Sequence, residues 1–389
     1  MGRPTRNEQF SADEVCLVHA VQRCVRRAFL SGVDPVTQKD YSHRQQWIRC
    51  RLEALASVFG IDVLTYSVMS NHLHVILRNR PDVVGTWSDH EVALRWLRIF
   101  PGCRLEEQLA DPTQTAVDQL AANKPRISEV RKRLSDISWF MRALCEPIAR
   151  MANKEDDCTG RFFEGRFRAQ RIVDDAGLLA CSVYVDLNPL RAALAATLEQ
   201  AQVSSAFDRL QAAQGATVPS AAFELVAVSA DEAGKRIRKT PADLLKQQRS
   251  AHSRGSGRPV RCDSWLAPMK RDREKLASDP EAHAGRTRAS NKGFLDVDWD
   301  AYFALLHWTS QAKVAASPNQ PPEEIAALLS RVGIDPAKWC DLVWNYRRYF
   351  GRSTCAGSPK AMSDDAARVG KAFHIGQAAA KACFLANAS

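Results

Sequence analysis

His72 and His74 flank a single leucine near the end of an apolar run that covers residues 61–77. The run predicts β-structure, and side chains alternate between the two faces of a strand, so both imidazoles are expected on one face. Two imidazoles on one face can bind one metal ion together. The pattern is short, and it fits two ordinary strand histidines equally well, one in water and one hydrogen-bonded. Other residues have to decide between these interpretations.

A tyrosine and an asparagine four residues apart supply the other groups of a chemical site. Residues 176–187 predict a helix, and residues four apart lie on one helix face, so Tyr184 and Asn188 project together. Pro189 disfavours helical backbone at the residue before it, which places Asn188 at the helix end with its amide available as a ligand. A phenol, an amide and two imidazoles are the parts of a metal-dependent enzyme that cuts DNA through a covalent tyrosine. The prediction is Tyr184 as nucleophile, with the two histidines and Asn188 as metal ligands.

Tyr66 is the alternative nucleophile, because it lies six residues before His72. Its position beside the apolar run favours packing, so Tyr184 is preferred. His19, His43 and His90 are expected to be structural or surface residues.

Several segments in the first half of the chain resemble one protein family. Residues 66–77, YSVMSNHLHVIL, resemble the histidine-hydrophobe-histidine strand of the single-tyrosine HUH endonucleases, which include the IS200-like transposases. Residues 184–191 are similar to the tyrosine helix of the REP-associated tyrosine transposases, and residues 137–142 and 160–167 fit the same branch. The second half of the chain carries no catalytic motif of this kind.

The resemblance implies a metal-dependent single-stranded DNA endonuclease and strand transferase. Such an enzyme acts on hairpin-forming repeat DNA, here REP elements, through a covalent 5′-phosphotyrosine intermediate. The implied cofactor is Mg²⁺ or Mn²⁺; imidazole nitrogen suits manganese better, whereas amide and phosphate oxygens suit both. The implied assembly is a monomer or a homodimer.

Two other classes of function remain open. A catalytically idle, sequence-specific DNA-binding protein or repressor derived from a transposase is the first, although a mere binder needs none of the four chemical side chains. An RNA-binding protein that uses an open sheet face is the second, but it would need stacking aromatic residues where the histidines stand.

Hydrophobic periodicity predicts the elements that must position these side chains. A β-rich stretch at residues 14–25 precedes a helix at 43–59, and strands at 61–69 and 72–77 form a hairpin. A further helix is expected at 137–152. This order predicts an α+β fold, an antiparallel sheet with helices on one face and the histidines on the open face. The resemblance implies that this sheet is of the ferredoxin-like or RRM-like HUH type, followed by a mostly helical C-terminal region.

The charge of the chain indicates an acidic partner. The 389 residues carry a formal net charge of +10, and the pI is near 9.1. Arginines interleave with phenylalanines at residues 160–171, which fits either a DNA contact or a half-buried strand with solvated arginines. The candidate DNA-binding residues are Arg26, Arg27, Arg161, Arg166 and Arg168.

Cysteine spacing and hydropathy favour a cytoplasmic protein. The eleven cysteines are scattered, without a Cys-x-x-Cys pair, so reduced thiols are expected and a structural zinc site is the lesser alternative. The chain has no run of eighteen apolar residues, and its N-terminus lacks the apolar core of a signal peptide. We therefore expect a cytoplasmic protein without membrane association, and the family resemblance implies a bacterial, nucleoid-associated location.

Composition divides the chain into three predicted parts. Residues 1–205 are the predicted catalytic domain, residues 206–290 a basic linker or DNA-contacting arm, and residues 291–389 a helical C-terminal domain. Residues 235–275 hold thirteen Lys or Arg against four Asp or Glu. In the C-terminal part, a plain helical domain is preferred over a helix-turn-helix.

Overall fold

The computed structural model of the chain describes residues 9–25, 28–100, 111–222, 259–271, 287–312 and 320–385. Arg26, Arg27 and most of the basic segment at 235–275 lie outside these ranges. Within the ranges, none of the helices combines the length and the hydropathy needed to cross a bilayer.

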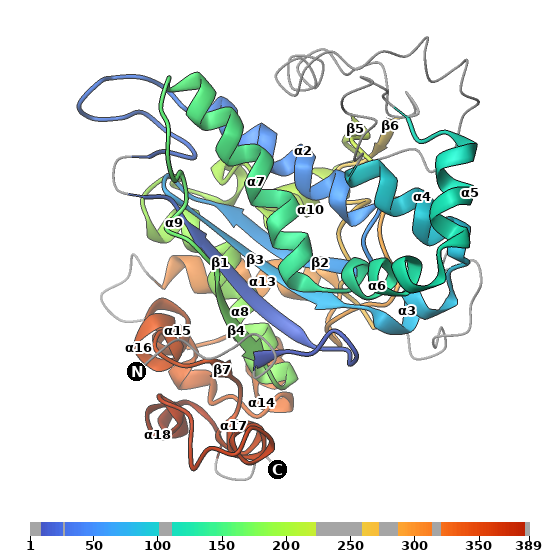
Figure 1. Ribbon diagram of the computed structural model, residues 1–389. Helices are drawn as coiled ribbons and strands as arrows, with labels where there is room; N and C mark the ends of the chain where they lie inside the picture. The colour runs from blue at the N-terminus through green and yellow to red at the C-terminus, as the bar shows by residue number, and fades with distance from the viewer. Residues whose placement is uncertain are drawn as a thin grey trace.

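A mixed five-stranded sheet lies at the centre of the molecule (Figure 1), with the strand order β2-β3-β1-β4-β7. Its strands are β1 (Leu17–Arg23), β2 (Ile61–Val68), β3 (His72–Asn79), β4 (Arg168–Ile172) and β7 (Cys355–Ala356). The first four pair antiparallel, whereas β7 from the C-terminal region joins β4 in parallel. The predicted α+β class and the predicted hairpin of β2 and β3 are therefore confirmed.

One face of the sheet packs on the two long helices of the first half of the chain. These are α2 (His43–Ala56) and α7 (Ile137–Glu155), which cross the front of the sheet in Figure 1. Leu73, Val75 and Leu77 alternate with the histidines along β3 and enter this first core. The alternation of apolar residues therefore leaves the histidines on the opposite face.

That opposite face is also covered by helices, so the predicted open face is wrong. Helix α8 (Asp175–Asp186) packs on it, and α13 (Trp299–Gln311), α15 (Trp339–Trp344) and α16 (Tyr346–Phe350) complete a second core. The physical reason lies in α8, whose residues 176–186 are all buried. A helix that is apolar on all sides must be enclosed on all sides, and the C-terminal helices supply the second layer.

The remaining elements surround these layers. They are α3 (Pro81–Thr86), α4 (Asp89–Ile99), α5 (Gln114–Ala122), α6 (Lys124–Leu134), α9 (Asn188–Arg191), α10 (Ser205–Ala213), α14 (Glu323–Arg331), α17 (Pro359–Arg368) and α18 (Gln377–Ala380). A separate two-stranded sheet pairs β5 (Thr217–Pro219) with β6 (Pro259–Arg261).

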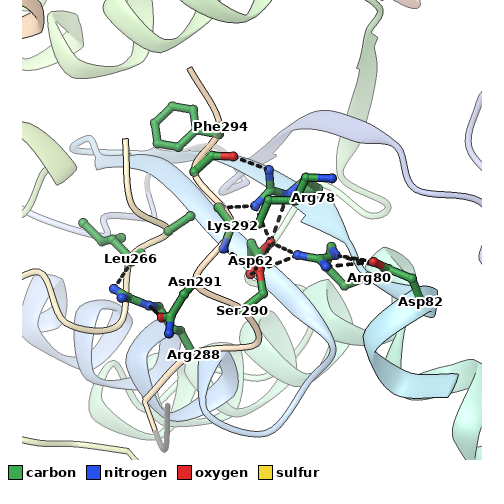
Figure 2. Close-up of polar contacts among 12 residues, drawn as sticks. Asp62, Arg78, Arg80, Asp82, Leu266, Arg288, Ser290, Asn291, Lys292 and Phe294 are labelled. Atoms are coloured by element: carbon green, nitrogen blue, oxygen red, sulfur yellow. Dashed lines mark hydrogen bonds and ion pairs between the residues drawn. The ribbon is translucent and has the colours of Figure 1, made fainter. Parts of the chain in front are cut away.

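A buried ion network fixes the start of the C-terminal region to the β2–β3 hairpin (Figure 2). Asp62 accepts hydrogen bonds from its cross-strand neighbour Arg78, at 2.7 Å, and from Ser290, at 2.9 Å. Arg78 also donates to the Gly293 carbonyl at 3.0 Å, and Arg80 reaches both Asp62 and Ser290. Because every charge in the network is paired, the contact holds the two regions together without leaving an uncompensated buried ion.

Candidate active site

His72 and His74 lie side by side on β3, with their ring centroids 4.9 Å apart. His74 is 4% exposed, whereas His72 is partly buried and its Nδ1 lies 2.8 Å from the Asn71 side-chain oxygen. The period of the strand places both imidazoles on one face, as the sequence predicts.

Helix α8 brings Tyr184 against this pair. The ring centroids of Tyr184 and His74 are 5.6 Å apart. Asn188 is the first residue of α9, and its Nδ2 donates to the Tyr184 carbonyl at 3.0 Å. The two residues therefore lie together, as their spacing predicts, although the amide nitrogen of Asn188 is already engaged and only its oxygen remains to bind a cation.

Tyr184 is covered by an aromatic ring from the C-terminal region. Tyr346 of α16 stacks on it with ring centroids 4.4 Å apart and planes inclined by 16°, and Tyr184 is only 5% exposed. Sequence reasoning missed Tyr346, because it lies more than 160 residues from Tyr184 and no local spacing connects the two.

Burial controls the protonation of these groups. Burial and then the charge of Arg23 lower the pKa of His72 to about 4, and burial lowers that of His74 well below its usual range. Both imidazoles are neutral at pH 7, which is the form that binds a metal ion. Burial raises the pKa of Tyr184, whereas Arg191 and Arg347 act in the opposite direction. The phenol is therefore protonated at neutral pH.

A third histidine adjoins the pair. His19 of β1 is 4% exposed, and its Nε2 lies 2.8 Å from Nδ1 of His74. The expectation of a merely structural or surface residue overlooks this contact. It arises from the register in which Val21 faces His74, which puts His19 on the same face one step along. Strand register cannot be read from spacing within one strand.

The second ring nitrogen of His74, Nε2, is buried and has no hydrogen-bond partner among the described residues. An unpaired buried nitrogen is unfavourable, and such groups commonly mark a functional role or a bound ion. A neutral imidazole nitrogen next to a second histidine and a phenol fits a divalent cation.

Tyr66 occupies a different environment. It belongs to the first core, on the other side of the sheet from Tyr184, and its hydroxyl donates to Asp208 at 2.8 Å. Burial and the neighbouring Asp208 raise its pKa well above the usual range. The geometry therefore gives Tyr66 a structural role.

The described candidate DNA-binding arginines, Arg161, Arg166 and Arg168, are all exposed. Arg168 donates to the backbone carbonyls of Phe350 and Ser353, at 3.3 Å each, so it anchors the C-terminal region.

A separate buried group could hold a metal ion. The ligand atoms of Cys355, Asp365 and His374 all lie within 4.8 Å of one another. Burial acts to raise the pKa of Asp365, but the hydrogen bond from His374 and the charge of Arg368 lower it to about 2. Arg171 also lies 3.4 Å from the same carboxylate. A cation would have to compete with two guanidinium groups here.

No protein-family model matches the chain, and no curated protein matches it. Among solved structures, a REP-associated tyrosine transposase bound to a REP hairpin is similar over 61% of this chain and 100% of its own chain. The identity is 13% and the TM-score is 0.32.

Proposed function

We propose that the protein is a metal-dependent single-stranded DNA endonuclease and strand transferase, a transposase with Tyr184 as its nucleophile. The carrying observation is the position of the Tyr184 ring, 5.6 Å from that of a neutral, buried His74 whose Nε2 has no partner among the described residues. A protein that only binds DNA needs neither group. The resemblance of residues 66–77 and 184–191 to HUH transposases supports the same assignment.

The proposed ligands of the ion, Mg²⁺ or Mn²⁺, are His72, His74 and Asn188. A bound divalent cation supplies Lewis-acid activation of the scissile phosphate and orients it. Asn188 also holds the backbone of Tyr184 through its 3.0 Å hydrogen bond. The same residue therefore positions the nucleophile relative to the phosphate.

The chemical step is an in-line displacement at phosphorus. The Tyr184 oxygen forms a bond to phosphorus and loses its proton, the bond from phosphorus to the 3′ oxygen breaks, and that oxygen leaves as a hydroxyl. Arg191 and Arg347 favour the phenolate that must form, because their charges lower the pKa of the phenol. The phosphotyrosine bond conserves the energy of the phosphodiester, so attack by another 3′ hydroxyl rejoins DNA without ATP. The 5′ polarity of the link follows from the family resemblance.

The proposed partner is single-stranded DNA with hairpins, contacted by Arg26, Arg27, Arg161, Arg166 and Arg168. The proposed state is a monomer or homodimer in a bacterial cytoplasm, close to the nucleoid. With Tyr184 5% exposed beneath Tyr346, a DNA strand reaches the phenol only when α16 moves away.

The decisive experiment compares Tyr184→Phe with Tyr66→Phe. Each protein is incubated with single-stranded hairpin DNA and Mn²⁺, and covalent adducts are mapped by mass spectrometry. We expect the adduct on Tyr184, its loss in Tyr184→Phe and its persistence in Tyr66→Phe. An adduct on another residue, or cleavage by Tyr184→Phe, would refute the assignment.

Because Tyr346 covers Tyr184, one alternative is a sequence-specific DNA-binding protein or repressor that no longer cuts DNA. Tight binding to hairpin DNA without any adduct, with and without Mn²⁺, would support this alternative.

A further inference from the structure

We propose that His19 is a positioning residue that fixes the tautomer of His74, so that Nε2 of His74 carries the lone pair available to a divalent cation. The hydrogen bonds of His19, His74 and Gln170 carry this inference. It rests on the proposed function only for the identity of the ligand.

The hydrogen bonds of Gln170 determine which atoms donate and which accept in the series that runs from Gln170 through His19 to His74. Its Nε2 donates to the Phe350 carbonyl at 2.7 Å and to the Ser353 carbonyl at 3.0 Å, so both amide protons are used. Its oxygen accepts from the Tyr346 hydroxyl at 2.9 Å and has a second lone pair. Since carbonyl oxygens only accept, the orientation of this amide is determined.

His19 must therefore donate to Gln170. His19 and Gln170 are direct partners in the register of β1 and β4, so their side chains lie on one face of the sheet, and the amide of Gln170 offers His19 only an acceptor. The Nε2 atom of His19 faces His74, which leaves Nδ1 to hold the proton given to Gln170. A neutral imidazole has one N–H, so Nε2 of His19 is an acceptor.

The tautomer of His74 follows from that of His19. Its Nδ1 lies 2.8 Å from the accepting Nε2 of His19 and must carry the proton, so Nε2 of His74 carries the lone pair. The planes of the two rings are inclined by only 18°, and their centroids are 5.1 Å apart. The two bonded nitrogens are 2.8 Å apart, so the difference between the two distances is about two ring radii. The hydrogen bond thus runs close to both ring planes, which is the favourable geometry.

The tautomer of His72 is fixed in the same way, by Asn71. Its Nδ1 lies 2.8 Å from the side-chain oxygen of Asn71, which can only accept, so Nδ1 holds the proton. Both histidines of β3 therefore present Nε2 as the basic nitrogen. Partners of this kind orient ligating histidines and typically change metal affinity by about 10- to 100-fold.

The first test needs neither metal nor DNA. Long-range ¹H–¹⁵N spectra of the full chain with ¹⁵N-histidine report which ring nitrogen holds each proton, and His74→Gln identifies the His74 signals. We expect His74 protonated on Nδ1 in the wild type. Protonation on Nε2 would overturn the proposal.

The second test asks whether His19 acts through its acceptor nitrogen or only by filling space in the core. His19→Phe keeps an aromatic ring but removes the acceptor, whereas His19→Gln places an amide oxygen near the former Nε2. We expect Mn²⁺ affinity, measured by calorimetry, to fall about 10- to 100-fold in His19→Phe. The Gln variant should retain most of it and keep the His74 tautomer. Equal affinity and an unchanged tautomer in His19→Phe would contradict the proposal.

The two tests also separate this inference from the proposed function. Correct tautomers without a Tyr184 adduct would retain the role of His19 and reject the transposase. A Tyr184 adduct formed by a His19→Phe protein with unchanged Mn²⁺ affinity would support the transposase and reject the role of His19.

Discussion

The phenols of Tyr184 and Tyr66 lie on opposite sides of one sheet, and their surroundings assign them different tasks. Tyr184 adjoins the neutral imidazoles of His74 and His19, and the charges of Arg191 and Arg347 act on its phenol. Tyr66 is fully buried and bound to Asp208 in a network that includes Arg49. At the scale of single residues, the surroundings of the two phenols are the reason for proposing Tyr184, and not Tyr66, as the nucleophile.

Tyr66→Phe tests this contrast through stability. The variant leaves Asp208 without one of its hydrogen-bond donors, so the free energy of unfolding should fall by about 1–3 kcal/mol. Urea denaturation measures the loss, and Tyr184→Phe, which removes a hydroxyl on the other side of the sheet, is the matched control. A Tyr66→Phe protein as stable as the wild type would contradict a structural role.

Residue spacing predicted part of this arrangement and missed the rest for a physical reason. The shared face of His72 and His74 follows from strand period, and the proximity of Tyr184 and Asn188 follows from helix period. The contact of His19 with His74 and the stack of Tyr346 on Tyr184 join distant segments, which no local period encodes. The roles of the proposed ligands stay predictions.

Helix α8 is the element on which the proposed site depends, and Asp186 anchors it. This buried carboxylate accepts from the Ala206 amide at 3.1 Å, from the Tyr302 hydroxyl at 2.8 Å and from Ser205. These bonds tie α8 to α10 and α13. The sequence predicts α8 but not the helices on its far side, because those helices come from a distant segment of the chain.

Asp186→Asn should reveal a pH-dependent cost of this anchor. Burial raises the pKa of Asp186 from 3.8 to about 6, so its contribution to stability is present at low pH and is lost as the pH rises through 6. The unfolding free energy of the variant relative to the wild type should therefore rise by about 2 kcal/mol between pH 4.5 and 7.5, at roughly 1.4 kcal/mol per pH unit. Urea titrations of both proteins across this range give the difference. A difference that does not change with pH would show that Asp186 is not shifted.

Helix α16 controls access to Tyr184 if the stack of Tyr346 has to open. Tyr346→Leu and Tyr346→Phe both lose the hydroxyl that binds Gln170, but only the leucine variant loses the stacked ring. We expect faster amide hydrogen exchange in residues 346–350 and faster adduct formation in Tyr346→Leu than in Tyr346→Phe. Equal exchange in the two variants would mean that the stack does not hold α16 closed.

At the scale of the whole molecule, residues from both halves of the chain form the second core. Leu64 and Ile76 from the hairpin pack in the same cluster as the C-terminal helices, and a side chain at Gly177 would come within 2.6 Å of the Ala356 carbonyl. The predicted class could be read from local patterns, whereas this joint packing depends on contacts between distant segments. The predicted borders near residues 205 and 290 stay predictions.

The basic charge of the whole chain should appear as salt-dependent DNA binding. Trp265 and Leu266 are buried, so a deletion confined to residues 235–258 removes basic residues and leaves them in place. If four of the removed residues contact phosphates, the log–log slope of affinity for single-stranded DNA against salt should flatten by roughly 3. Fluorescence anisotropy at several salt concentrations measures the slope. An unaltered slope and affinity would make this segment a linker only.

The short strand β7 also bears on the solubility of the protein. An unpaired strand edge is a template for intermolecular pairing, and here β7 occupies the edge of β4. Bridges from Val63 to Leu266 and from Ser67 to Ser204 cover parts of the opposite edge, on β2. A fragment cut at the predicted catalytic border, residue 205, keeps Ser204 and α8 but loses Leu266 and β7, so it would expose the edge of β4, part of the edge of β2 and the apolar outer side of α8. We therefore expect the C-terminal half to protect the sheet from intermolecular strand pairing and aggregation.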